Sequence, residues 1–392
     1  MFEEKISELS LATPSSFIRS ILKTTQNNDI ISFAGGLPNP ISFPKEELQE
    51  STNRVIESFG SRVFQYSVTV GLPELREYIA AHLHETQEMD VDPEEIIVTT
   101  GSQQALDMIG KVLINQDDTV ILEEPAYLGA IQAFSQYRPK FTAIPLESDG
   151  MDMEKLEEKL KEGAAKFIYT VPNFQNPSGL TYSKEKREAL HKLSRKYNCI
   201  LVEDDPYGDL KFEGKPYGYI SKHEFDGSIL LGTFSKTVTP GMRCGYMIIR
   251  DPELRFRINT AKEAADLHSN VFSQYILWDY LTHNDLSKHI EKIKQLYKNQ
   301  SSAMIAAMEK YFPESVAFTR PEGGMFIWAT LPEGKTAMEL FEKAIEKQVA
   351  FVPGDPFYID GREANTMRLN YTNCDEKTIT EGIRRLGELM RD

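Results

Sequence analysis

Short apolar runs that alternate with longer amphipathic stretches constrain the fold of this 392-residue chain more than any other feature. Helical patterns such as Lys184 to Tyr197 separate the runs, and this order predicts a mostly parallel sheet with helices on both faces. Another run, Tyr246 to Ile249, follows its predecessor too closely for a helical crossover, so we expect an antiparallel strand there. The other runs are Ile96–Thr99, Thr119–Leu122, Phe167–Tyr169, Cys199–Val202 and Ile229–Leu231.

The two ends of the chain differ from its middle. Near the N-terminus the pattern predicts one helix, Ser15 to Gln26, followed by a segment rich in Gly and Pro. Towards the C-terminus it predicts a long charged helix, Asp285 to Tyr311, then a few strands and a terminal helix, Glu376 to Arg391. We therefore expect a large α/β domain and a smaller α+β domain made from both termini. The expected ranges are 47–284 for the large domain, and 1–46 with 285–392 for the small one.

Acidic residues outnumber basic ones by 59 to 44, which gives a formal charge of −15. This balance argues against a nucleic-acid partner, although a pocket inside an acidic protein can still be basic. No stretch approaches the ~20 apolar residues of a membrane span, and the first residues lack the order of a signal peptide. Because Cys199, Cys244 and Cys374 form no Cys-x-x-Cys pair, we expect neither a zinc ribbon nor disulfides, and a cytoplasmic location.

Candidate site residues follow directly after the apolar runs, because such sheets bind ligands beyond the carboxyl ends of their strands. Gly101-Ser102-Gln103 opens a helix whose free N–H groups favour an anion, although a capped helix start has the same pattern. Tyr127 can stack on a planar ligand or pack in the core. Asn176, within Asn-Pro-Ser-Gly, marks either a turn or a rigidly held amide.

Charged residues follow two further central runs. Asp204 belongs to an acidic run, which usually forms a solvated loop, but a carboxylate at the end of a buried strand needs a cationic partner. No histidine or second acidic cluster lies nearby, so we do not expect a metal site. Lys236 follows the run Ile229–Leu231, and Arg243 comes seven residues after it. Most lysines are surface charges, yet desolvation and a nearby positive charge lower the pKa of a lysine, and a neutral amine can form a Schiff base.

In this order the motifs resemble the pyridoxal-phosphate (PLP) aminotransferases of class I/II. The resemblance implies fold type I, in which a mostly parallel seven-stranded sheet forms the large domain. It is strongest at Ser235-Lys236 with Pro240-Gly241-Met242-Arg243, and it extends from Ser32–Pro40 to Met367–Tyr371. The branch with aminoadipate/kynurenine, aromatic and branched-chain aminotransferases is the most similar. The segments that indicate this branch are Gln65-Tyr66-Ser67 and Gly101-Ser102-Gln103-Gln104.

The resemblance implies roles for individual residues. Lys236 would be the Schiff-base lysine and proton shuttle, and Asp204 would pair with the pyridine nitrogen of the coenzyme. Tyr207 and Asn176 would bind the phenolic oxygen of the ring. Tyr127 would stack on the ring face. The phosphate contacts would be Ser102, Gln103, Thr233, Ser235, Arg243 and Tyr66. In this family the residue that matches Tyr66 reaches the phosphate of the neighbouring subunit.

The resemblance also implies a homodimer with its sites at the interface, and a ping-pong reaction of an L-amino acid with a 2-oxo acid, usually 2-oxoglutarate. Arg368 would bind the substrate α-carboxylate, and Gly36 would lie close to the substrate. Arg19 is either a solvated helix arginine or a group that meets an acidic side chain, which would favour glutamate or 2-aminoadipate. Candidate donors are 2-aminoadipate and the aromatic and branched-chain amino acids.

Two other functions compete with transamination. A β-eliminating lyase or a decarboxylase on the same fold would use nearly the same residues, because the coenzyme carries the chemistry. The fold also serves as a sensor domain in bacterial transcription regulators, behind a helix-turn-helix domain. Here the family match begins within the first few dozen residues and the net charge is −15, so we expect an enzyme rather than a sensor.

Overall fold

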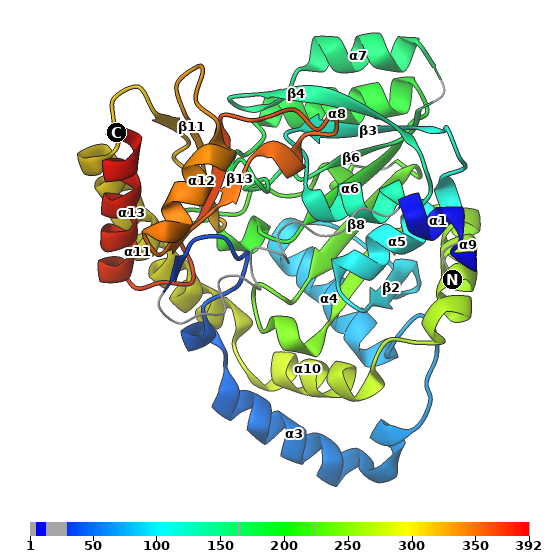
Figure 1. Ribbon diagram of the computed structural model, residues 1–392. Helices are drawn as coiled ribbons and strands as arrows, with labels where there is room; N and C mark the ends of the chain where they lie inside the picture. Colours follow the sequence, from blue (N-terminus) through cyan, green and yellow to red (C-terminus); the bar gives the residue numbers. More distant parts are fainter. Residues whose placement is uncertain (1–4, 13–29, 164, 224, 392) are drawn as a thin grey trace.

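The computed structural model describes residues 5–12, 30–163, 165–223 and 225–391, and a large twisted sheet lies at its centre (Figure 1). Five neighbouring strands run parallel to one another, and an antiparallel strand lies near one edge of the sheet. In order across the sheet the strands are β2 (Ile96–Thr99), β9 (Gly245–Ile249), β8 (Ser228–Thr233), β7 (Ile200–Asp205), β6 (Ala165–Thr170), β3 (Thr119–Glu124), β4 (Lys140–Glu147) and β5 (Gly150–Met151).

The sheet confirms the strands that the apolar runs predict, and β9 is antiparallel to β8 and β2 as expected. Strand β4 was not among those runs, because its sequence is half-exposed along most of its length and contains Pro145. With β4 the sheet has the seven strands that the family resemblance implies. The two-residue strand β5 pairs antiparallel with β4 and extends the sheet to eight.

Helices cover both faces of this sheet because successive strand residues point to opposite sides. Ile229 and Leu231 pack with α5 (Ser102–Leu113), α6 (Leu128–Ser135) and α9 (Pro252–Asp266). Leu230, between them, packs with α4 (Pro73–Gln87) and α10 (Val271–His283). Towards β4, this second face is covered by α7 (Met153–Lys161) and α8 (Lys184–Lys196). The strands are therefore buried on both faces, which explains their continuous apolar runs.

A smaller antiparallel sheet lies beside the large one, with the order β10 (Ala317–Phe318), β11 (Phe326–Thr330), β14 (Thr366–Asn370) and β13 (Val352–Pro353). Helix α11 (Leu286–Tyr311), which Asp285 caps, packs on α13 (Glu376–Arg391), so both predicted C-terminal helices are confirmed. The remaining helix on this side is α12 (Ala337–Glu346) (Figure 1).

Residues from the N-terminal part join this smaller unit. Strand β1 (Ile31–Ser32) pairs in parallel with β12 (Val349–Ala350). This pairing favours a small domain built from both termini, while the exact domain boundaries stay a prediction. The predicted helix Ser15 to Gln26 lies outside the described residues. The short helix α1 (Glu8–Ala12) is described, and among the described helices none is long and apolar enough to cross a membrane.

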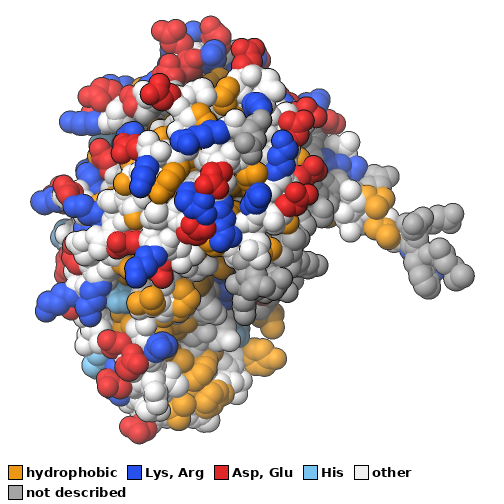
Figure 2. Space-filling view, turned by 60° about the vertical axis from the view of Figure 1, so that its left-hand side comes forward, with side chains coloured by type: hydrophobic (Ala, Val, Ile, Leu, Met, Phe, Trp, Pro, Cys, Tyr) orange, Lys and Arg blue, Asp and Glu red, His pale blue; other side chains and the backbone are white. Residues whose placement is uncertain are grey.

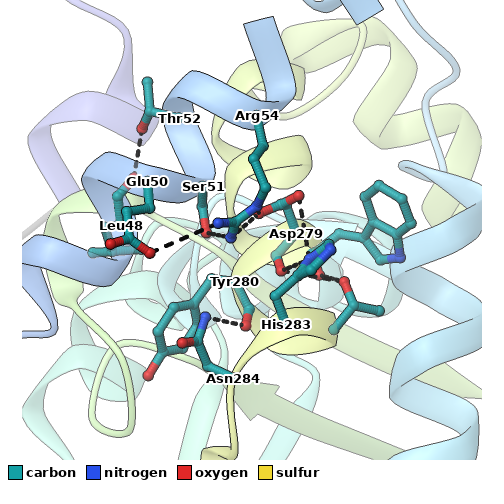
Figure 3. Close-up of polar contacts among 11 residues, drawn as sticks. Leu48, Glu50, Ser51, Thr52, Arg54, Asp279, Tyr280, His283 and Asn284 are labelled. Atoms are coloured by element: carbon teal, nitrogen blue, oxygen red, sulfur yellow. Dashed lines mark hydrogen bonds and ion pairs between the residues drawn. The ribbon is translucent and has the colours of Figure 1, made fainter. Parts of the chain in front are cut away.

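Helix α3 (Lys45–Phe59) leads away from this N-terminal segment and is tied to α10 by an ion pair (Figure 3). Arg54 Nη2 donates to Asp279 Oδ1 over 2.6 Å and to Ser51 Oγ over 3.0 Å. Asp279 is 4% exposed, so its charge needs this partner. The backbone carbonyl of Asp279 also lies 2.9 Å from His283 Nδ1. The ion pair between Arg54 and Asp279 holds α3, and with it the segment that leads to Tyr66, against the large domain.

Candidate active site

A cavity of about 510 Å³ lies at the carboxyl ends of β6, β7 and β8. It brings together twelve of the fourteen residues that the sequence predicts for the site. Of the other two, Tyr66 lies outside the cavity and is 78% exposed, and Arg19 lies outside the described residues. The cavity is lined by Gly36, Leu37, Pro38, Ser102, Gln103, Tyr127, Val171, Asn176, Asp204, Pro206, Tyr207, Thr233, Ser235, Lys236, Pro240, Arg243 and Arg368.

Lys236 follows β8 and extends its amine into this cavity. Its Nζ donates to the carbonyl oxygen of Gly36 over 2.9 Å, which links the large domain to the N-terminal segment. Burial, together with the positive charges of Arg368 and Arg243, lowers the pKa of Lys236 to about 8. The amine is therefore partly neutral at mildly alkaline pH, where it can act as a nucleophile or a base.

Asp204 occupies the end of β7 and is 2% exposed. Its Oδ2 accepts a hydrogen bond from Tyr169 Oη over 2.7 Å, while its Oδ1 has no hydrogen-bond partner among the described residues. Burial raises the pKa of Asp204 to about 7, against the opposing effect of the bond from Tyr169. A cation placed against Oδ1 would stabilise the charged form.

Hydroxyl, guanidinium and backbone donors meet at the start of α5. Ser102 Oγ is buried without a partner among the described residues. Nearby, Thr233 Oγ1 donates to Ser235 Oγ and accepts from the backbone N–H of Ser235. Arg243 Nη2 donates to the carbonyl of Thr100. A side chain at Gly101 would be strained, because this residue has a φ of +73° and a Cβ there would displace that same nitrogen, 2.5 Å away. This donor set at a helix N-terminus suits a dianion such as a phosphate.

Arg368 is brought to the cavity by β14 of the smaller sheet and is 2% exposed. Its Nη1 donates to Asn176 Oδ1 over 2.9 Å, and its Nη2 donates to the carbonyl of Ala34 over 2.8 Å. The guanidinium lies 4.4 Å from the ring centre of Phe326 and 5.3 Å from that of Phe357. Burial lowers the pKa of Arg368 to about 10, still far above neutrality, so it remains a cation that can bind a carboxylate.

An amide and a phenol lie together in the wall of the cavity. Asn176 Nδ2 lies 3.4 Å from Tyr207 Oη, and both side chains are buried. Gln103, at the start of α5, instead donates through Nε2 to the carbonyl of Gly129 over 3.2 Å. The sequence predicted these three residues, but not Tyr169, Phe326 or Phe357, which contact Asp204 and Arg368. Those three belong to apolar segments, in which an aromatic residue predicts only a place in the hydrophobic core.

Residues 36–386 match the family model described as aminotransferase class I and II. The chain belongs to this family. This aminotransferase is 44% identical to aromatic-amino-acid aminotransferase 1 of Thermococcus litoralis, over 100% of this chain and 95% of that protein. It is 41% identical to the 2-aminoadipate transaminase of Thermus thermophilus, over 96% of this chain and 94% of that protein. The predicted branch of the PLP aminotransferases is thereby confirmed.

The structure of Pyrococcus horikoshii kynurenine aminotransferase in complex with PMP superposes on this aminotransferase with a TM-score of 0.94. The two chains are 44% identical, and the match covers 99% of this chain and 97% of that one. The predicted fold type I and the coenzyme pyridoxal phosphate are confirmed.

The cavity of this aminotransferase fits that coenzyme. Buried polar atoms without a partner are costly, so they mark where complementary ligand groups bind. Three line the cavity among the described residues: Asp204 Oδ1, Ser102 Oγ and Arg368 Nε. A coenzyme with a basic ring nitrogen and a phosphate, together with a substrate carboxylate, satisfies all three.

Proposed function

We propose that this aminotransferase moves the amino group of an L-amino acid to a 2-oxo acid, 2-oxoglutarate in the usual case, by a ping-pong mechanism. One observation carries the proposal. A single cavity joins the amine of Lys236, whose pKa is lowered, with the unpartnered oxygen of Asp204 and the buried cation of Arg368. These are a nucleophile and base, a partner for a protonated ring nitrogen, and a binding group for an α-carboxylate.

Bound pyridoxal phosphate supplies an aldehyde that condenses with amines and a ring that accepts electrons released at the substrate Cα. The chain supplies the rest. Lys236 Nζ would hold the coenzyme as its Schiff-base lysine and would hold and move the proton at the substrate Cα, for which a pKa of about 8 is well placed. Asp204 would keep the ring nitrogen protonated. Tyr207 and Asn176 would donate to the phenolic oxygen, and Tyr127 would cover the ring face.

The remaining residues would orient the substrate and the phosphate group of the coenzyme. Arg368 positions the α-carboxylate, and Gly36, whose carbonyl already accepts from Lys236, lies beside the substrate. A Cβ at position 36 would lie 3.2 Å from Phe326 Cζ, so a larger residue there would press on this ring. The residues that would hold the phosphate are Ser102, Gln103, Thr233, Ser235, Arg243 and, from the neighbouring subunit, Tyr66.

The donors that we propose are 2-aminoadipate and the aromatic and branched-chain amino acids. Relatives named for aromatic amino acids, 2-aminoadipate and kynurenine support this choice. Arg19, which lies outside the described residues, is either a solvated arginine or the group that meets an acidic donor side chain, and a preference for 2-aminoadipate or glutamate would favour the second role. We also expect a cytoplasmic enzyme.

A screen of amino donors and oxo acids on the purified protein tests the reaction. The visible absorbance of the coenzyme should shift when an accepted amino acid converts it to the amine form, and adding 2-oxoglutarate should restore it. Release of pyruvate and ammonia from cystathionine, with no amino transfer to any oxo acid, would contradict transamination.

Replacing Arg368 with lysine should lower kcat/KM for amino acids by about 10²-fold, chiefly through KM. Lysine keeps the charge but loses the planar fork that holds Asn176, the Ala34 carbonyl and the substrate together. The kinetics are measured with an amino acid and with the matching amine that lacks the carboxylate. An equal loss with both substrates would argue against carboxylate binding by Arg368.

We propose that the enzyme is a homodimer whose interface includes the segment around α3. Six of the twelve large apolar side chains that are exposed in the described residues lie between residues 37 and 68. Figure 2 shows hydrophobic side chains gathered at the lower end of the molecule, the end that α3 and α10 form in Figure 1. Exposed apolar patches of this kind mark protein interfaces. The six residues are Leu37, Ile41, Ile56, Phe64, Tyr66 and Val68.

Tyr66 offers a test of this arrangement by complementation. Tyr66→Phe should weaken coenzyme binding about tenfold, because a charge-assisted hydrogen bond to the phosphate is lost. Mixing this variant with Lys236→Ala should restore tight coenzyme binding and turnover, since one site of each mixed dimer then has both natural residues. Mixed dimers are isolated with two affinity tags. If they show only the activity of Tyr66→Phe, Tyr66 serves its own subunit.

A further inference from the structure

Asp204 is held on one side by a tyrosine that the proposed mechanism does not use. Strands β6 and β7 are parallel neighbours in which Tyr169 pairs with Val202. Strand residues two apart share a face, so Asp204, two residues after Val202, lies on the same face as Tyr169 and closer to the cavity. This register brings Tyr169 Oη to 2.7 Å from Asp204 Oδ2. The second oxygen, Oδ1, is left without a partner among the described residues, and Asp204 lines the cavity.

The tyrosine itself is rigidly placed. Tyr169 is 0% exposed, and its ring packs edge-on against Phe134 with ring centres 5.8 Å apart. Burial and the neighbouring charge of Asp204 raise the pKa of Tyr169 well above its usual value, so the phenol keeps its proton and remains a donor. A fixed donor to Oδ2 determines the plane of the carboxylate.

We propose that Tyr169 is a positioning residue, which orients Asp204 and stabilises its charged form so that Oδ1 can bind the ring nitrogen of the coenzyme. This inference rests on the proposed role of Asp204. It assigns a function to a residue of the sheet interior that touches neither the cavity nor the substrate.

The groups around Asp204 make this single hydrogen bond important. Burial and the charge of Glu123, from β3, both raise the pKa of Asp204, and the bond from Tyr169 lowers it. Tyr127 and Tyr207 also interact with its charge, and Lys236 shares the cavity. The pKa of about 7 is the balance between burial and Glu123, which raise it, and the hydrogen bond from Tyr169, which lowers it. Removing the phenol oxygen raises this pKa further, so less carboxylate is present at neutral pH.

Tyr169→Phe tests the inference, and Tyr182→Phe is its matched control. Tyr182 is 1% exposed, and its Oη donates over 2.9 Å to Glu123, a second buried carboxylate of the same sheet. Both variants lose a buried phenol–carboxylate bond, but only Tyr169→Phe loses one to Asp204. The measurement is the dissociation constant of pyridoxal phosphate from the coenzyme-free protein, followed by fluorescence from pH 5.5 to 9.

Coenzyme affinity of the natural protein and of Tyr182→Phe should fall as the pH drops below about 7, because Asp204 becomes protonated. In Tyr169→Phe the midpoint should move up by about one pH unit, which makes the dissociation constant about fivefold larger at pH 7, where the natural protein is already half protonated at Asp204. Placing 3-fluorotyrosine, a stronger donor of the same shape, at position 169 should move the midpoint down.

A midpoint in Tyr169→Phe equal to that of the natural protein would overturn the inference. The same holds if both Phe variants shift alike, because the effect would then be one of packing. If Tyr169→Phe does not fold, the protein with 3-fluorotyrosine at position 169 provides the test. An unchanged pH midpoint of coenzyme affinity in that protein would contradict the inference. Failure of the natural protein to bind pyridoxal phosphate would instead contradict the proposed function.

Discussion

Lys236→Ala should reduce transamination by about 10⁴-fold or more, the largest effect that we expect of any single substitution. The variant loses both the amine that holds the coenzyme and the base that moves the substrate proton. No other lysine among the described residues lines the cavity, so none can replace it. Stopped-flow measurement of one half-reaction gives the rate directly, and the visible band of the natural enzyme's coenzyme should be absent.

Lys294→Ala provides the control for this substitution. Lys294 is 9% exposed, but it lies outside the cavity and pairs with Glu291 on α11. Its replacement should leave kcat/KM within a few-fold of the natural value. Transamination by Lys236→Ala at the natural rate would refute our assignment of the Schiff-base lysine.

Asp204→Asn should lower kcat/KM by about 10³-fold while making the coenzyme-free protein more stable at pH 8. The amide keeps an oxygen for Tyr169 but loses the charge that the ring nitrogen needs. Burial raises the pKa of Asp204 from 3.8 to about 7, so the native state binds more protons than the unfolded state between these values. Stability of the natural protein therefore falls as the pH rises through this window, and asparagine removes that loss.

Thermal unfolding of the two coenzyme-free proteins at pH 4 and pH 8 checks the second effect, and the difference in Tm should appear only at pH 8. Asp205→Asn is the matched control for the kinetics. Asp205 is the next residue of β7, and its pKa is also raised to about 7, but it bonds Asn173 and the N–H of Gly208 outside the cavity. It should gain stability at pH 8 and keep its kcat/KM. A kinetic loss as large as that of Asp204→Asn would show that the effect is not specific to the coenzyme.

Most of the large sheet could be predicted from the sequence because its strands are buried on both faces and stand out as apolar runs. Strand β4 could not, since Lys140 to Glu147 is half-exposed and mixes polar residues with Pro145. The site residues Asp204 and Lys236 could be predicted for the same reason as the strands. Each follows a buried run, and parallel strands bring their carboxyl ends to one edge.

Arg368 shows what a local pattern cannot provide. It lies in the antiparallel sheet of the smaller unit and reaches Asn176, 192 residues earlier in the chain. Only the resemblance to a family indicated its role beforehand. Its ring contacts with Phe326 and Phe357 had no signal in the sequence, because an aromatic residue in an apolar run reads only as core.

The sequence by itself determined the parallel α/β architecture, the edge of the sheet that carries the site, and the residue types that meet there. These follow from periodicity and from the residues that end each strand, which are local properties. Only the tertiary structure decided that Tyr169 occupies one oxygen of Asp204 and leaves the other free. It also decided that the charge of Arg368 lies near Lys236. Such pairings depend on register and packing between distant segments, which no stretch of sequence encodes alone.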